Sequence, residues 1–195
     1  MKQLEKEKII NKAAKEYAKF MDVLLPDWKE DKNMVDTPMR VSRAFVEDIF
    51  SGLYDDNFKI TAFPNDGYDG LVMQCNIPVK SICSHHHQII DGIAHVAYIP
   101  GDTVIGLSKL NRTVDYFARR PQLQETLTIQ IHDFISNICI GNAGVAVIIK
   151  AKHACCSHRG IKHDSDMQTI KISGAFKDDS KVREEFYSLI QNTKR

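Results

Sequence analysis

The chain has 195 residues, of which 43% are hydrophobic and 26% are charged, and its formal net charge is +1. This composition is typical of a globular protein with a buried core, and the near-neutral charge excludes an overall field that would attract nucleic acid or a membrane surface. The sequence contains no apolar run of about 18 residues, so we expect no membrane-spanning segment. The charged first residues lack the apolar centre of a secretory signal, which indicates a cytoplasmic protein.

The first part of the chain is predicted to be helical. Apolar residues at helical spacing predict a helix over residues 3–25, and a second helix is expected from Asp36 or Thr37 to Gly52, with Pro38 in its first turn. Clusters of Gly, Pro, Asn and Asp over residues 54–70 predict a loop around one short extended piece. We therefore expect a helical segment at residues 1–52 and a second, larger domain at residues 53–195.

The second part alternates strands and helices. Strands are predicted over residues 71–80, 89–99, 145–151 and about 168–175, and helices over 108–117, 122–139 and 180–191. Two hairpins that flank a pair of helices indicate an α+β domain, with a four-stranded antiparallel sheet and helices on one face.

Two short clusters combine cysteine with histidine. Cys83 and His86 have the C-x2-H spacing that directs a thiolate and an imidazole toward one metal ion. The second cluster, at residues 153–159, offers the thiolate of Cys155 or Cys156, and the residues alone leave this choice open. Two thiolates and one imidazole leave the fourth zinc position to water, which is a catalytic arrangement; a structural zinc site and a metal-free set of core cysteines are the alternatives.

Further polar residues surround these clusters. His85 and His153 are spare imidazoles whose ordinary pKa of about 6.5 suits proton transfer. A serine and three basic residues either bind a polyphosphate at a helix start or belong to a solvated helix face. These residues are Ser108, Lys109, Arg112 and Arg159.

Five stretches of the sequence, which run in order and cover nearly everything from residue 36 onward, resemble the GTP cyclohydrolase I family. The stretches are DTPMRVSRAFVEDIFSGL, SICSHHH, GIAHVAYIPGDTVIGLSKLNRTVDYFARRPQLQETLTIQI, AKHACCSHRGI and SGAFKDDSKVREEFYSLI. The resemblance implies the tunnelling fold and a homodecamer with active sites between subunits. It also implies the zinc-dependent conversion of GTP and water into formate and 7,8-dihydroneopterin triphosphate.

The resemblance also implies a role for each matching residue. Cys83, His86 and Cys155 match the ligands of one zinc ion per subunit, and His85 and His153 match the acid/base histidines. The implied substrate contacts are Gln124 and Glu125 at the guanine, Ser108, Lys109, Arg112 and Arg159 at the triphosphate, and Arg40 and Arg43 from a neighbouring subunit.

The chain departs from the family pattern beside the first cluster. Ser84 stands where the family usually has glutamate, and His87 adds a third consecutive histidine. A neutral serine loses or reroutes any contact made by that carboxylate, and in an extended segment His85 and His87 would face the same side. GTP cyclohydrolase I activity is our leading hypothesis. The alternatives are a related purine nucleotide hydrolase with a formyl-retaining product and a non-catalytic, zinc-binding oligomer.

Overall fold

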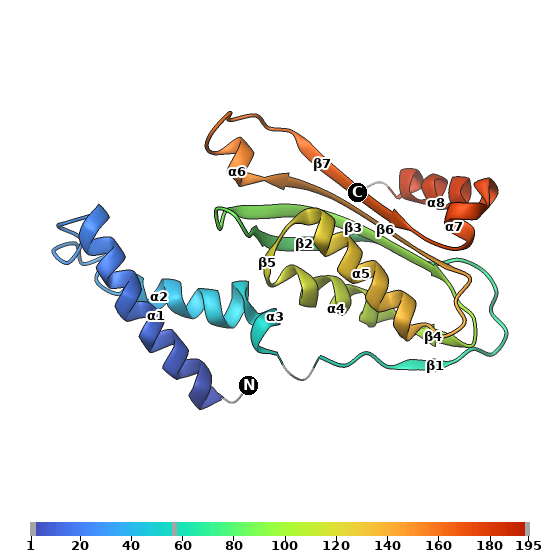
Figure 1. Cartoon of the computed structure of the whole chain (residues 1–195), viewed down its shortest axis with the longest axis horizontal. Coiled ribbons are helices and arrows are strands. Elements are labelled where there is room, and N and C mark those ends of the chain that lie inside the picture. Colours follow the sequence, from blue (N-terminus) through green and yellow to red (C-terminus); the bar gives the residue numbers. More distant parts are fainter. Residues whose placement is uncertain (1–2, 56–57, 194–195) are drawn as a thin grey trace. The chain divides into compact units, whose positions relative to one another are not determined.

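The computed structural model describes residues 3–55 and 58–193 (Figure 1). The chain divides into two compact units, Met1–Phe58 and Lys59–Arg195, which we call the helical unit and the sheet unit. Within the described ranges, no helix has both the length and the apolar character needed to cross a membrane.

The helical unit contains two main helices that pack against each other, α1 (Gln3–Leu24) and α2 (Thr37–Ala44). The predicted second helix reaches past Gly52 but is not continuous, because α2 is followed by a π-helical turn (Phe45–Ile49) and a short α3 (Ser51–Tyr54). The Phe50 amide donates to the Phe45 carbonyl at 2.7 Å, five residues back instead of four. Pro38 occupies the start of α2, as predicted.

The sheet unit is built on a five-stranded sheet in the order β5-β2-β3-β6-β7. Four strands are antiparallel: β2 (Val72–Cys83), β3 (Ile89–Ile99), β6 (Gly144–His153) and β7 (Asp166–Ile172). The α+β class with its four-stranded antiparallel sheet is thus confirmed. The short extended piece expected within residues 54–70 is β1 (Ala62–Pro64), which pairs with β4 (Thr103–Ile105) in a separate ribbon. The structure adds β4 and β5 (Pro121–Gln122), which pairs in parallel with the end of β2; both strands are too short for hydrophobic periodicity to reveal them.

Helices α4 (Leu107–Ala118) and α5 (Gln124–Ile138) cover one face of the sheet. Tyr98, Val147 and Ile149 point toward them and form the main core with Leu127. The alternate strand residues face the other way and pack against Phe176 and Phe186, from α7 (Ala175–Asp178) and α8 (Ser180–Asn192). The closing helices therefore lie on the opposite face, which corrects the prediction that the helices cover one face only. Helices on both faces require a strand that is apolar on both sides, and β6 is such a strand, since residues 144–149 are all buried.

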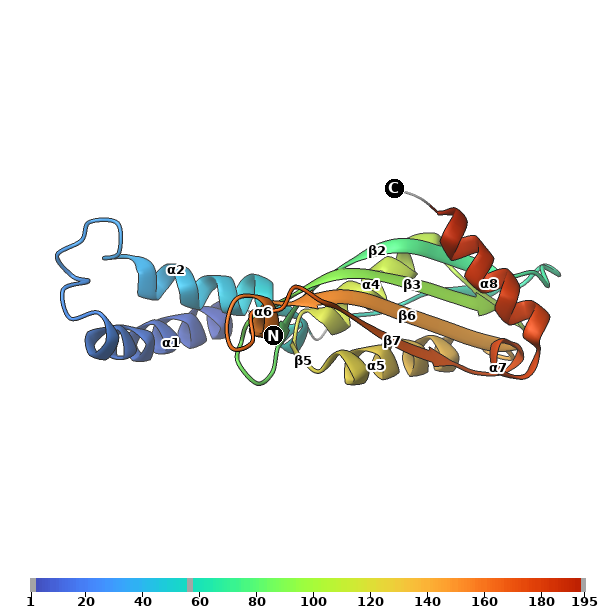
Figure 2. The same cartoon turned by 90° about the horizontal axis from the view of Figure 1, so that it is seen from above.

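Strand pairing brings distant parts of the chain to one end of the sheet. Because β3 pairs with both β2 and β6, Ile82 lies opposite Ile89, and Ile90 lies opposite His153. The β2–β3 loop and α6 (Ala154–Ser157), which follows β6, therefore meet at the same end, whereas α7 and α8 lie at the other end (Figure 2).

Candidate metal centre and active site

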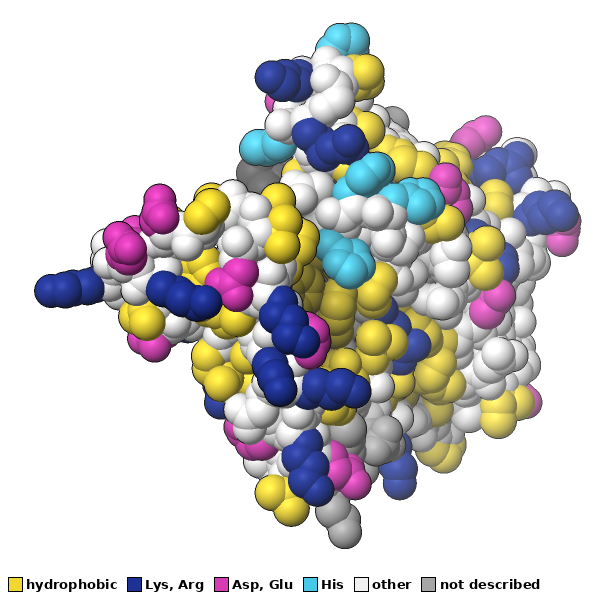
Figure 3. Space-filling view, turned by 60° about the vertical axis from the view of Figure 1, so that its left-hand side comes forward, with side chains coloured by type: hydrophobic (Ala, Val, Ile, Leu, Met, Phe, Trp, Pro, Cys, Tyr) yellow, Lys and Arg dark blue, Asp and Glu magenta, His cyan; other side chains and the backbone are white. Residues whose placement is uncertain are grey.

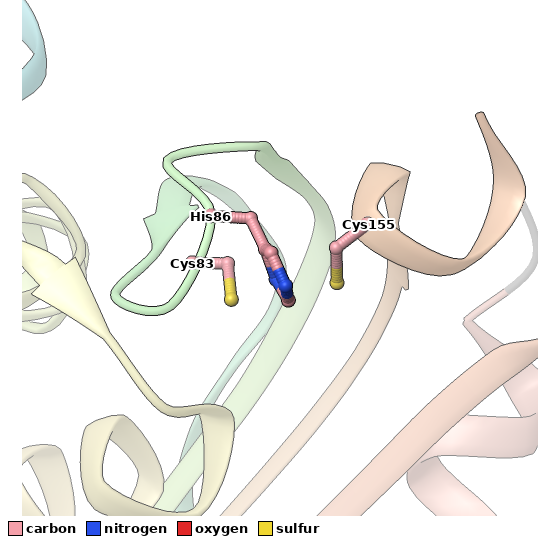
Figure 4. A group of neighbouring side chains, drawn as sticks. All are labelled: Cys83, His86 and Cys155. Atoms are coloured by element: carbon pink, nitrogen blue, oxygen red, sulfur yellow. The ribbon is translucent and has the colours of Figure 1, made fainter. Parts of the chain in front are cut away.

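Three side chains with metal-binding atoms converge at this end of the sheet. The sulfurs of Cys83 and Cys155 and a ring nitrogen of His86 all lie within 4.8 Å of one another, and the three side chains point into the same space (Figure 4). Sulfur ligands of a tetrahedral zinc ion lie about 3.8 Å apart, so small side-chain rotations would let one ion contact all three. Two sulfurs and one imidazole nitrogen form a donor set that zinc prefers, and the residues present fit this metal.

A tight turn presents Cys83 and His86. The Cys83 amide donates to the Gln88 carbonyl at 2.8 Å, and the His87 amide donates to the Cys83 carbonyl at 2.9 Å. His87 takes a left-handed backbone conformation (φ 49°), which is uncommon for a residue other than glycine. Residues 84–86 thus form a turn, and the alternation of an extended strand that we applied to His85 and His87 does not hold.

Cys155 is the member of the vicinal cysteine pair that joins the group; it is half-buried, whereas Cys156 is exposed. Burial, reinforced by the neighbouring sulfurs of Cys83 and Cys156, raises the pKa of the Cys155 thiol to about 11. Two sulfurs this close resist joint ionisation, and a bound cation would reverse that preference.

His153, at the end of β6, is held by Gln124, the first residue of α5. His153 Nε2 lies 2.8 Å from Gln124 Oε1, and the Gln124 amide also contacts β6 and β7. Burial lowers the pKa of the His153 imidazole, and the negative charge of Glu125 partly opposes this shift. The ring is therefore neutral near pH 7, as a proton acceptor must be.

The other predicted residues of the sheet unit lie on exposed or partly exposed elements. Ser108 and Arg112 are exposed and Lys109 is half-buried in the first turns of α4, where free backbone amides favour anions. His85 lies in the β2–β3 turn, Glu125 in the first turn of α5, and Arg159 beyond α6; all three are exposed.

The two predicted arginines of the helical unit already have carboxylate partners there. Arg43 contacts Glu7 at 2.9 Å and Glu47 at 3.0 Å, and Arg40 contacts Asp36 at 3.0 Å. These ion pairs fix how Arg40 and Arg43 are held within the helical unit.

All eight histidines belong to the sheet unit, and several gather on one face of the molecule (Figure 3).

Sequence reasoning missed the hydroxyls that support Gln124 and His153. Thr169 of β7 contacts the Gln124 amide at 3.1 Å and the Thr128 hydroxyl at 2.7 Å. The available signal was the spacing of Gln124, Thr128 and His132, three buried polar residues at intervals of one helical turn beside the apolar residues of α5.

Comparisons with known proteins show similarity to one family. The model of the GTP cyclohydrolase I family matches residues 13–191. The chain is 45% identical to GTP cyclohydrolase 1 of Wigglesworthia glossinidia brevipalpis over 181 residues, which is 91% of this chain and 82% of that protein. It is 43% identical to GTP cyclohydrolase 1 of Enterobacter sp. (strain 638), over 89% of this chain and 78% of that one.

Among solved structures, archaeosine synthase QueF-Like in the apo form matches 55% of this chain and 96% of its own length, with a TM-score of 0.40 and 16% identity. The family match spans most of both units. The two relatives named above are more than 40% identical to this chain, and each alignment covers more than two thirds of the relative. The chain therefore belongs to the GTP cyclohydrolase I family of hydrolases.

Proposed function

We propose that this chain converts GTP and water into formate and 7,8-dihydroneopterin triphosphate, with one zinc ion held by Cys83, His86 and Cys155. The observation that carries the proposal is the convergence of these three ligand atoms, within 4.8 Å, in a chain of this family. When bound there, zinc lowers the pKa of a water ligand toward about 7 and so supplies a nucleophile.

The two histidines beside the ligands would move protons. His153 is neutral near pH 7 because burial lowers its pKa, so it is ready to accept a proton during ring opening. His85, exposed and adjacent to His86, is free to reorient when substrate binds and is the candidate proton donor.

The charged residues would hold the substrate. Glu125 is exposed at the start of α5, where its carboxylate can accept hydrogen bonds from the N–H groups of guanine. The triphosphate carries roughly four negative charges, which need cationic and amide partners when they are buried. The start of α4 offers Ser108, Lys109 and Arg112, and Arg159 extends from the loop after α6.

Arg40 and Arg43 would complete the site from a neighbouring subunit of a homodecamer. The proposal requires these arginines to exchange part of their contacts with Asp36, Glu7 and Glu47 for phosphate oxygens. Light scattering of the purified chain tests the assembly. We also propose a cytoplasmic location, since a reducing compartment keeps the ligand thiols free; the structure has all five cysteines unpaired.

The position of Ser84 favours one alternative. Its backbone is fixed by the bond from its amide to the Gln122 carbonyl (3.0 Å), but the side chain is exposed and cannot reproduce a carboxylate. A purine nucleotide hydrolase that retains the formyl group is therefore the second candidate. A large rise in turnover in the Ser84→Glu variant would mean that the serine weakens the later steps.

The decisive test is incubation of zinc-loaded protein with GTP, followed by identification of the product by mass and by a formate assay. We expect the dihydroneopterin triphosphate together with one formate per GTP. A product that keeps the formyl carbon supports the alternative. Intact GTP in the presence of folded, zinc-loaded protein overturns both.

A further inference from the structure

Gln124 is the most constrained polar side chain near the metal centre. It is 1% exposed, although it begins a helix. Its side-chain nitrogen lies 3.1 Å from each of three acceptors, the carbonyls of Ile149 and Met167 and the hydroxyl of Thr169, which share its two hydrogens. Its side-chain oxygen lies 2.8 Å from His153 Nε2.

These partners determine which way the amide points. A backbone carbonyl can only accept a hydrogen bond, so the NH₂ group of Gln124 must face Ile149 and Met167. Its Oε1 then faces His153, and because an amide oxygen also only accepts, the hydrogen between them belongs to His153 Nε2. A neutral His153 therefore keeps its lone pair on Nδ1, for which no hydrogen-bond partner is found within residues 3–55 and 58–193.

Two hydroxyl groups reinforce this orientation. The Thr128 hydroxyl donates to the Gln124 backbone carbonyl at 2.8 Å, which uses its only hydrogen. The contact between the Thr128 and Thr169 hydroxyls (2.7 Å) must then be donated by Thr169, whose oxygen remains to accept from Gln124. The hydrogens of Thr128, Thr169 and His153 each have one place in this network, and the two hydrogens of the Gln124 amide are shared among three acceptors on β6 and β7, so the network ties α5 to both strands.

We infer that Gln124 is a positioning residue, which fixes the ring plane and the Nε2–H tautomer of His153 and leaves Nδ1 as the nitrogen that accepts a proton. The catalytic consequence rests on the proposed function, whereas the tautomer rests on the hydrogen-bond geometry alone. The same geometry argues against a direct contact between Gln124 and guanine, because both hydrogens and the oxygen of the amide are already engaged.

The tautomer is measured directly by NMR of zinc-loaded protein labelled with ¹⁵N-histidine, with the His153 signals identified by their absence in His153→Gln. We expect one protonated nitrogen, Nε2, and one unprotonated nitrogen, Nδ1. In Gln124→Met, which keeps the length of the side chain and removes its hydrogen bonds, we expect both tautomers. A wild-type His153 protonated on Nδ1, or one that already exchanges between tautomers, overturns the inference even if Gln124→Met does not fold.

Gln122→Met is the matched control. Gln122 is also buried (4% exposed), but its amide donates to the Phe117 carbonyl and to Gln130 instead. We expect the His153 spectrum of this variant to match the wild type. A tautomer mixture in Gln122→Met as well would mean that general loosening, and not the bond from Gln124, sets the tautomer.

Kinetics with GTP test the catalytic consequence. Loss of positioning lowers kcat of Gln124→Met by about 10- to 100-fold, part of the full effect of a general base, and changes KM less than about twofold. Loss of a guanine contact raises KM with kcat retained, and that result overturns the positioning role. If the wild type does not turn over GTP, the proposed function fails, while the NMR result still decides the tautomer.

Discussion

Two histidines of the sheet unit have opposite surroundings. His132, in α5, is 4% exposed, and both ring nitrogens have partners: Nδ1 lies 2.8 Å from the Asp133 carboxylate, and Nε2 lies 2.9 Å from the Ser173 hydroxyl. His153 has one anchored nitrogen and one without a partner in the described chain. Both nitrogens of the buried His132 ring are engaged by neighbouring side chains, whereas His153 keeps one nitrogen available for proton transfer.

The two rings also hold their hydrogens on opposite nitrogens. A carboxylate only accepts, so neutral His132 carries its hydrogen on Nδ1, toward Asp133. Gln124 places the hydrogen of His153 on Nε2. A Ser-His-Asp triad has the same tautomer as His132, but His132 is 4% exposed and Ser173 Oγ also accepts from the Val145 backbone amide at 3.3 Å, so we assign this group to the packing of α5 and to no second catalytic site. We therefore expect variants around His153 to lose activity and variants around His132 to lose stability.

The largest effect is expected at the metal centre, which lies in the same region as His153. Cys155→Ser replaces a thiolate with a poor zinc ligand, so we expect bound zinc to fall from about one per subunit to near zero and turnover to become undetectable. Metal analysis and the GTP assay measure both quantities. The matched control is Cys156→Ser, which should retain both the zinc and the turnover. Loss of zinc in Cys156→Ser with zinc retained in Cys155→Ser would show that Cys156, and not Cys155, is the ligand.

At His153 we expect loss of chemistry with the fold retained. His153→Gln removes the proton-accepting nitrogen, so kcat should fall by about 10²- to 10⁴-fold. The free energy of unfolding should change by less than about 1.5 kcal/mol, since one hydrogen bond to Gln124 is affected. Steady-state kinetics and urea unfolding of the zinc-loaded protein measure the two effects. Turnover close to that of the wild type would remove His153 from the mechanism.

A feature of the fold or of the candidate site is predictable from the sequence when the residues that encode it lie close together in the chain. Residues 89–99, 122–139 and 180–191 were predicted close to the observed β3, α5 and α8, because long periodic patterns identify such elements. The short C-x2-H spacing predicts that Cys83 and His86 act together, but spacing alone leaves open whether Cys155 or Cys156 joins them. The partners of Gln124 were not, since Ile149 and Thr169 become neighbours only through the pairing of β6 with β7. That register is a tertiary property, and no pattern near Gln124 encodes it.

At His132 the expected result is the reverse of that at His153. His132→Leu removes two hydrogen bonds, one to Asp133 within α5 and one that joins α5 to Ser173 after β7, so the free energy of unfolding should fall by about 1–3 kcal/mol. The zinc content and kcat should stay within about twofold of the wild type, because the network does not reach the metal ligands. The comparison fails if this variant keeps its stability and loses its activity.

The smallest effect is the pH dependence of stability, and its sign follows from the same network. Burial lowers the pKa of His132, although the Asp133 carboxylate partly opposes the shift. The unfolded chain then binds a proton more readily than the folded one, so the stabilisation is complete above the unfolded pKa of about 6.5 and declines as the pH falls toward the folded value. Burial also lowers the pKa of His95 and His153, which add to the same trend.

The contribution of His132 is isolated by measuring urea unfolding of the wild type and of His132→Leu between pH 7.5 and 5.5. The wild type should lose more stability on acidification, by at most about 1.4 kcal/mol for each unit by which the folded and unfolded pKa values of His132 differ. Asp133 does not contribute between pH 7.5 and 5.5. Burial raises the pKa of its carboxyl, but hydrogen bonds from Lys171 and His132 lower it further, so this pKa lies below the usual range and Asp133 titrates at lower pH. Equal slopes for the two proteins would mean that Asp133 and Ser173 accommodate a charged His132 as well as a neutral one, and the ring would no longer count as fixed in one state.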